Sequence, residues 1–168
     1  MRFSAQEEYG LRCLLQMARH EETGGMTIPE IARCEGLTVA YVGKLMRILR
    51  EAKLVQSTRG QQGGYQLAMP SSEVNLSQVL TALGGQLYSD DFCDRFAGNE
   101  SACVHIGDCS IRSAWSSLYD IFGHLLSQIR LKDLVRSESA MSSWVRAHVD
   151  PPTPGEFRKL GSGMGSNS

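Results

Sequence analysis

The segment from Thr27 to Lys53 constrains the fold of this chain more than any other. Thr27 begins a T-x-x-E capping signature, the pattern that opens a helix, and Gly36 ends that helix. Thr38 then caps a longer helix. The apolar residues of this second helix recur at helical spacing and predict a buried stripe of Val42, Leu45, Met46 and Leu49. A short helix, a glycine-containing turn and a longer helix form a helix-turn-helix.

A glycine-rich hairpin is predicted directly after these helices. A strand begins at Leu54, the sequence RGQQGG supplies a flexible turn at 59–64, and a second strand returns at 65–67. We interpret this hairpin as a wing.

Two more helices are predicted around this segment. Residues 4–19 carry apolar side chains at helical spacing, with Ser4 and Glu7 as a capping box. Asn75 opens a short helix that ends at the glycine pair 84–85.

A long helix is predicted from just after Cys109 to about Leu131. Its apolar residues lie on one face: Ile111, Trp115, Leu118, Phe122, Leu125 and Ile129. So small a domain offers this stripe few partners, which predicts packing against a second subunit.

These elements predict a mostly α fold with a small β-hairpin wing, in four parts. A winged helix-turn-helix domain is expected over 1–84, a cysteine-bearing loop over 85–109, and a dimerisation helix with a C-terminal turn over 110–136. From Ser137 onward Ser, Pro and Gly dominate, so 137–168 is predicted to be a tail without fixed structure.

Charge is distributed unevenly along the chain. The formal net charge is only −1, but five basic residues and one acid lie between Ala40 and Gln62, whereas acids gather around the later cysteines. Local charge, not net charge, determines where nucleic acid binds. The N-terminus has no apolar leader, and no apolar run reaches membrane-spanning length. We therefore expect a cytoplasmic protein without membrane contact.

The second helix of the helix-turn-helix is the candidate DNA-reading element. Its N-terminal residues would face base edges in the major groove, and the candidates are Thr38, Ala40, Tyr41, Gly43 and Lys44. Arg47 and Arg50 lie where phosphate contact is expected, and Arg59 and Gly60 lie at the wing tip, suited to a minor groove. The alternative is a basic face that is merely solvated. No catalytic constellation occurs, so no enzymatic activity is predicted.

Three of the five cysteines, Cys93, Cys103 and Cys109, lie within seventeen residues that show no clear periodicity and are interpreted as a loop. Soft thiolates select iron–sulfur clusters, zinc or Cu(I). Zinc sites usually contain close C-x2–4-C pairs, which the C-x9-C-x5-C spacing lacks. An unligated redox trio remains the alternative. Cys13 and Cys34 are predicted to be buried structural residues.

From Met1 to about Val135 the chain resembles the winged-helix iron–sulfur transcription regulators that include IscR, NsrR and CymR. The resemblance rests on MRFS…EYGLRCLLQMA, on TIPEIARCEGLTVAYVGKLMRILREAKLVQSTRGQQGGYQLA, and on the helix after GDCSIRSAW. It implies a homodimer on a palindromic operator, with Arg59 in the minor groove. Ala40 and Gly43 depart from the serine and glutamate of the iron–sulfur regulator, so the operator sequence does not carry over.

The resemblance also implies one iron–sulfur cluster per subunit, 2Fe–2S or 4Fe–4S, held by Cys93, Cys103 and Cys109. A histidine that serves as fourth ligand in one branch is Arg112 here. In another branch an acidic residue near the start of the first helix, supplied by the partner subunit, takes that place, and Glu8 matches it. His105, within the cysteine loop, is the competing candidate.

The sequence therefore predicts a dimeric DNA-binding transcription regulator that senses redox state, nitric oxide or iron–sulfur status through a cluster. Two alternatives stay open. One is a metal-free thiol–disulfide switch, and the other is a cluster-free regulator controlled by a protein partner.

Overall fold

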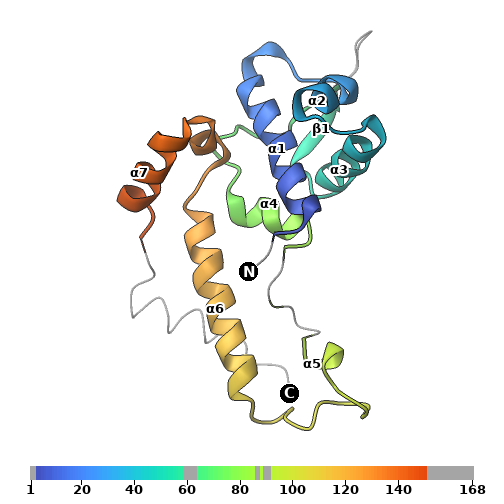
Figure 1. Cartoon of the computed structure of the whole chain (residues 1–168), viewed down its shortest axis with the longest axis vertical. Helices are drawn as coiled ribbons and strands as arrows, with labels where there is room; N and C mark the ends of the chain where they lie inside the picture. Colours follow the sequence, from blue (N-terminus) through green and yellow to red (C-terminus); the bar gives the residue numbers. More distant parts are fainter. Residues whose placement is uncertain (1–2, 59–63, 86–87, 89–91, 151–168) are drawn as a thin grey trace. The chain divides into compact units, whose positions relative to one another are not determined.

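The computed structural model describes residues 3–58, 64–85, 88 and 92–150 (Figure 1). The chain divides into two compact units. The first comprises Met1–Gly85 with Leu126–Val149, and the second comprises Gln86–Leu125 with Asp150–Ser168. Most of the described residues are helical, with a single hairpin between α3 and α4, which confirms the predicted fold class.

The first unit begins with three helices whose starts are capped as the sequence predicts. Helix α1 spans Ala5–Arg19, α2 spans Ile28–Glu35 and α3 spans Val39–Glu51. Ser4 and Thr27 each form a complete capping box, and the Thr38 side chain accepts from the backbone N–H of the third helical residue. A short 3-10 helix η1, Glu21–Thr23, follows α1. Gly36 adopts φ +66° after α2, the left-handed conformation that lets the chain turn toward α3.

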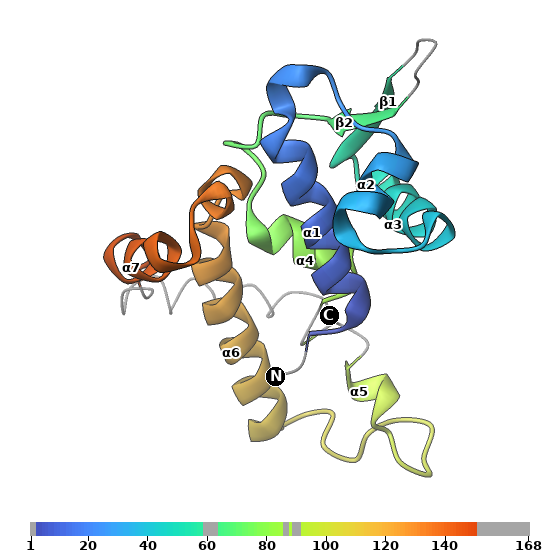
Figure 2. The ribbon, with the colours of Figure 1, turned by 45° about the horizontal axis from the view of Figure 1, so that its top comes forward.

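The hairpin pairs β1 (Val55–Thr58) with β2 (Gly64–Leu67) in antiparallel register (Figure 2). Tyr65 also forms a bridge with Met26, so the second strand is joined to the chain just before α2. This contact requires glycine at position 64, because a Cβ there would lie 2.7 Å from the carbonyl oxygen of Met26. The predicted wing tip, with Arg59 and Gly60, lies outside the described residues.

One apolar core lies beneath α1, α3 and the hairpin. The four residues predicted as the stripe of α3 are fully buried: Val42, Leu45, Met46 and Leu49. Helix α4 (Leu76–Ala82) begins at Asn75, as predicted, with a capping box to Gln78. Its start is joined to residues far along the chain by an isolated bridge between Asn75 and Arg130.

Helix α6 spans Ser110–Ser127 and ends before the predicted Leu131. The reason is competing backbone pairing: the N–H of Leu131 donates to Val74 at 2.8 Å, and that of Leu76 donates to Ile129 at 3.0 Å. Leu131 then enters the core and opens the 3-10 helix η2 (Leu131–Val135). Extended pairing with the start of α4 thus replaces the final helical turn.

Two regions predicted without regular structure contain helices. Within the cysteine stretch, Phe92–Arg95 form the short helix α5, where the ring of Phe92 packs against Tyr88 and Phe96. The predicted tail begins with helix α7 (Glu138–His148), which Ser137 caps. Ser, Pro and Gly content predicted a tail without fixed structure here, but Ser137 caps the helix and the Trp144 ring stacks on His148 one turn later. Among the described residues no helix is long and apolar enough to cross a membrane.

Candidate DNA-reading helix and cysteine site

The outer face of α3 is polar and exposed. Thr38, Ala40 and Lys44 are exposed at its start, and Arg47 and Arg50 are exposed further along. These positions alternate with the buried stripe, so packing the core orients the cations toward solvent. Arg47 forms a loose ion pair with Glu51 at 3.8 Å, and both side chains are 67% exposed. Such an exposed pair contributes little stability and leaves the guanidinium accessible to a phosphate.

Two predicted reading residues, Tyr41 and Gly43, are only partly exposed. The Tyr41 ring packs edge-on against Tyr9 of α1, with centroids 6.1 Å apart. A Cβ at Gly43 would meet nothing closer than Ile28 Cδ1 at 4.0 Å. Glycine is thus not required at position 43 for packing within the chain.

The three clustered cysteines are free thiols of intermediate exposure in the second unit. Each occupies a different local structure: Cys93 lies in α5, Cys103 opens a turn closed by the Ile106 N–H, and Cys109 immediately precedes α6. The Cys109 sulfur accepts from the backbone N–H of Arg112 at 3.3 Å. The first turn of a helix stabilises negative charge, which a thiolate ligand carries.

Arg112, which stands where one branch of the resembling family has its histidine ligand, also contacts Cys93. Its Nη1 lies 3.7 Å from the Cys93 sulfur and donates to the Ile106 carbonyl at 3.0 Å. The hydrogen bond with Cys93 raises the pKa of the Arg112 guanidinium. One side chain therefore joins two of the three cysteine segments.

Soft thiolate donors of this kind are the ligands that iron–sulfur clusters take. Among the described residues, no three His, Cys, Asp or Glu side chains lie close enough together to hold one metal ion. A tetrahedral ion with metal–sulfur bonds of about 2.3 Å draws its ligands to within about 4 Å of one another. An iron–sulfur cluster distributes its ligands over two or four irons, so sulfurs that bind different irons lie farther apart. Cys93, Cys103 and Cys109 would hold such a cluster.

Glu7 and Glu8, adjacent on α1, have different environments. The Glu7 carboxylate is buried and accepts from the Ser4 N–H in the capping box, so it is committed to the helix start. Glu8 is exposed beside a leucine-lined pocket and is the available carboxylate of the pair. His105 is also exposed. Both predicted fourth ligands are thus accessible side chains.

Of the two remaining cysteines, Cys13 is buried as predicted and Cys34 is not. Cys13 is fully buried, and burial raises the pKa of its thiol to about 12, so it is the structural residue expected. Cys34 is exposed on α2, contrary to the prediction of burial. The apolar side of α2 is occupied by Ile31 and Ala32, and Cys34 falls outside it.

A partly buried ion pair connects α1 to the helix-turn-helix and has no sequence signature. Arg12 Nε donates to Glu35 at 2.6 Å, and the Gln16 amide donates to the other carboxylate oxygen at 2.6 Å. The Glu35 side chain is only 7% exposed. The position of Glu35 at the end of α2 therefore depends on α1.

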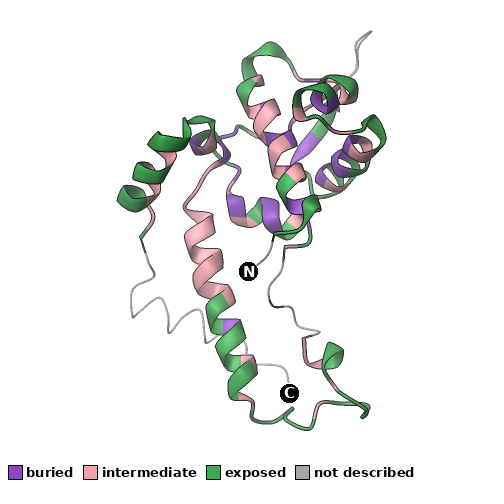
Figure 3. Cartoon of the chain, viewed as in Figure 1, coloured by how far each residue is buried: buried purple, intermediate pink, exposed green. Residues whose placement is uncertain are grey.

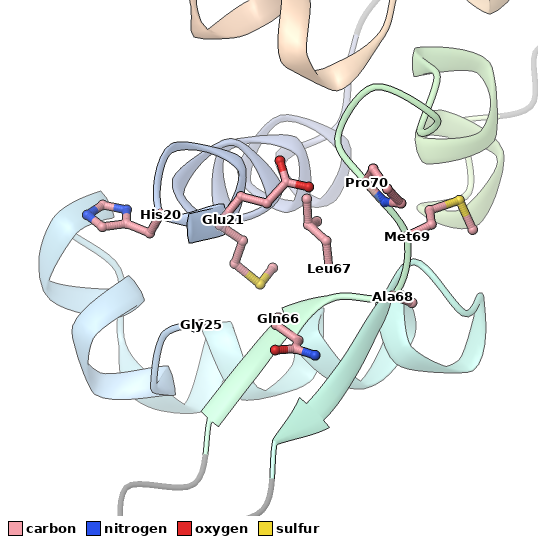
Figure 4. Close-up of a pocket in the computed structure, with 9 residues that line it drawn as sticks. His20, Glu21, Gly25, Gln66, Leu67, Ala68, Met69 and Pro70 are labelled. Carbon is pink, nitrogen blue, oxygen red and sulfur yellow. The ribbon is translucent and has the colours of Figure 1, made fainter. Parts of the chain in front are cut away.

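A cavity of about 270 Å³ lies between the end of α1 and β2 (Figure 4). Its carboxylate, Glu21, is already occupied by the backbone N–H and hydroxyl of Ser71, at 2.9 and 2.6 Å. The other lining residues are Met17, His20, Gly25, Gln66, Leu67, Ala68, Met69 and Pro70. The cavity therefore carries no part of the candidate sites.

Two helices joined by a tight turn, a basic outer face on the second helix and an adjoining strand hairpin define a winged-helix DNA-binding protein. Residues 3–137 match the Rrf2 family, described as iron-dependent transcriptional regulators. The chain belongs to the Rrf2 family of DNA-binding transcription regulators and is not an enzyme.

Individual relatives support this assignment. The chain is 32% identical over 139 residues to Protein rrf2 of Nitratidesulfovibrio vulgaris, a match that covers 83% of this chain and 90% of that protein. The solved structure of T. potens IscR aligns with a TM-score of 0.62 at 27% identity, over 80% of this chain and 86% of that one. CymR of B. subtilis shares the fold, with a TM-score of 0.60 at 23% identity over 80% and 96% of the two chains.

Proposed function

We propose that this regulator is a homodimer that binds a palindromic operator and adjusts its DNA affinity through an iron–sulfur cluster, one per subunit. Cys93, Cys103 and Cys109 would supply three ligands, and Glu8 of the partner subunit the fourth. When bound, the cluster would supply an iron site that responds to redox state, nitric oxide or iron–sulfur supply. We leave its nuclearity, 2Fe–2S or 4Fe–4S, open.

The cysteine stretch carries this proposal. Three free, partly accessible thiols lie in one compact unit, and a backbone N–H and a guanidinium of the same residue donate to two of them. Hydrogen bonds to cysteine sulfur are typical of the surroundings of iron–sulfur clusters.

The dimer is supported by the apolar residues that α6 exposes. Figure 3 shows exposed residues along its first half, and three large side chains there are more than half exposed: Ile111, Trp115 and Leu118. A second copy of α6 would cover this stripe. It would also set the distance between two α3 helices, which must match half-sites about 34–36 Å apart.

The test is an iron and sulfide count of anaerobically isolated protein, with binding measured to a DNA duplex selected from random sequence. We expect stoichiometric iron in the wild type and a loss of most of it in Cys103→Ser. Cys34→Ser removes an exposed thiol outside the trio and should retain the iron. Wild-type protein without iron or sulfide that binds the duplex as tightly as Cys103→Ser would refute the proposal.

The same preparations separate the alternatives. A thiol–disulfide switch would show two fewer free thiols after peroxide and no iron. A regulator controlled by a protein partner would lack iron and keep its thiol count. The fourth ligand is tested with Glu8→Ala and His105→Ala, using the exposed Glu22→Ala as control. A changed visible spectrum in Glu8→Ala alone supports the carboxylate, and a change in His105→Ala alone transfers the assignment to the histidine.

A further inference from the structure

Arg112 makes three contacts within the cysteine stretch from a single position in the first turn of α6. Its backbone N–H donates to the Cys109 sulfur, and its guanidinium reaches both the Cys93 sulfur and the Ile106 carbonyl. These partners lie before α6, in α5 and in the intervening turn. The side chain therefore ties segments separated by up to nineteen residues to the start of one helix.

The chemistry of a guanidinium limits what Arg112 does there. It stays protonated at any physiological pH and has five donors and no acceptor, so it cannot ligate iron. Beside a sulfur it supplies a positive charge and an N–H donor. Its planar group can donate to a sulfur and a carbonyl together, a geometry that the compact ammonium of lysine reproduces poorly.

The surrounding charge makes a cation at this position consequential. Between Phe92 and Arg112 there are three acids, Asp94, Glu100 and Asp108, against Arg95 and Arg112. Three thiolate ligands would add further negative charge to this short stretch. Adding an electron to a cluster there is opposed by that charge, and a guanidinium hydrogen-bonded to a ligand sulfur offsets it.

We propose that Arg112 is a positioning residue for the cysteine site, which holds Cys93 and the turn at Ile106 against the start of α6 and raises the reduction potential of the bound cluster. The effect on the potential rests on the function proposed above. The positioning of the loop does not, because it is a property of the iron-free chain.

Two measurements on the full-length chain test the two parts. In iron-free, reduced protein, amide hydrogen exchange over 103–109 should accelerate several-fold in Arg112→Ala. In anaerobically reconstituted protein, Arg112→Ala should shift the oxidised-to-reduced ratio at fixed potential at least tenfold toward the oxidised form, about 59 mV for one electron. Arg112→Lys should fall between Arg112→Ala and wild type in the potential. Arg146→Ala, which removes an exposed cation from α7, should match wild type in both measurements.

The outcomes separate this inference from the function on which it partly rests. Unchanged amide hydrogen exchange over 103–109 in Arg112→Ala overturns the positioning role. An unchanged reduction potential in that variant overturns the effect on the potential. In both cases, wild-type protein that contains iron and sulfide leaves the proposed function standing. Wild-type protein that takes up no iron or sulfide refutes the proposed function and the tuning role together, and the exchange measurement still decides the positioning role. If Arg112→Ala keeps its circular dichroism spectrum and still fails to take up iron and sulfide, iron uptake restored in Arg112→Lys supports a required cation. Failure of both variants to take up iron, together with unchanged amide hydrogen exchange, overturns the proposal.

Discussion

Cys13 and Cys34 show how far the fate of one residue type depends on its surroundings. Both are lone cysteines on amphipathic helices, and the sequence predicts burial for both. Cys13 has no exposed surface, whereas Cys34 faces solvent. The thiol of Cys34 is therefore open to reagents, and that of Cys13 becomes so only when the chain unfolds.

The buried thiol predicts a loss of stability at alkaline pH. Burial raises the pKa of Cys13 to about 12, against about 8.5 for a thiol in an unfolded chain. Above the lower value the unfolded chain releases this proton and the folded chain keeps it. The free energy of unfolding therefore falls as pH rises from about 8.5 toward 12, by about 1–2 kcal/mol at pH 10.

Urea unfolding of wild type and Cys13→Ala at pH 7 and pH 10 measures this effect. The variant is expected to be less stable at pH 7, because it loses packing, but to lose less stability than wild type between the two pH values. Cys34→Ala is the control and should follow the wild-type pH dependence. Equal pH dependence in wild type and Cys13→Ala would contradict the prediction.

At the scale of the element, the amphipathic helix α3 both packs into the core and presents cations to solvent. Its buried stripe fixes its rotation, and that rotation places Lys44, Arg47 and Arg50 on the exposed face. The neighbouring Thr38 cap and Gly36 turn involve residues close in sequence. This is why sequence patterns alone predicted the helix, its start and its exposed face.

The exposed cations of α3 predict the salt dependence of DNA binding. Each phosphate contact contributes about −0.9 to the slope of log affinity against log salt concentration. Lys44→Ala and Arg50→Ala should each weaken binding and reduce the magnitude of that slope by about one. Fluorescence anisotropy with the selected duplex, across a range of salt concentrations, measures it. Arg146→Ala should leave the slope unchanged, and wild-type slopes in both α3 variants would show that this face does not contact phosphates.

At the scale of the whole molecule, the dimer proposed above depends on the exposed apolar stripe of α6. Trp115→Glu places a charge within the exposed apolar face and should weaken dimerisation at least tenfold, because burying an unpaired charge is costly. Sedimentation velocity across protein concentrations measures the effect, and operator binding should weaken in parallel. Ser117→Glu, an exposed position two residues along the same helix, is the control. Dimers of unchanged strength in Trp115→Glu would place the interface elsewhere.

The order of elements, their caps and the α3 stripe were predictable because each depends on residues within a few positions of one another. The early end of α6 and the formation of α5 and α7 were not predictable from the sequence. Helix α6 stops at Ser127 because residues 129–131 pair with the start of α4, more than fifty positions earlier. Helix α7 forms where composition predicted a tail, and α5 forms where aromatic rings meet.

The sequence by itself determined the winged helix-turn-helix, the basic face of α3 and the presence of three cysteines with the chemistry of cluster ligands, since capping, periodicity and side-chain softness are local properties. Only the tertiary structure decided which groups surround those cysteines and which residues hold Glu35 at the end of α2. Arg112 reaches Cys93 across nineteen residues, and Arg12 holds Glu35 across twenty-three. Such contacts form because packing brings distant segments together, and no spacing along the chain encodes them.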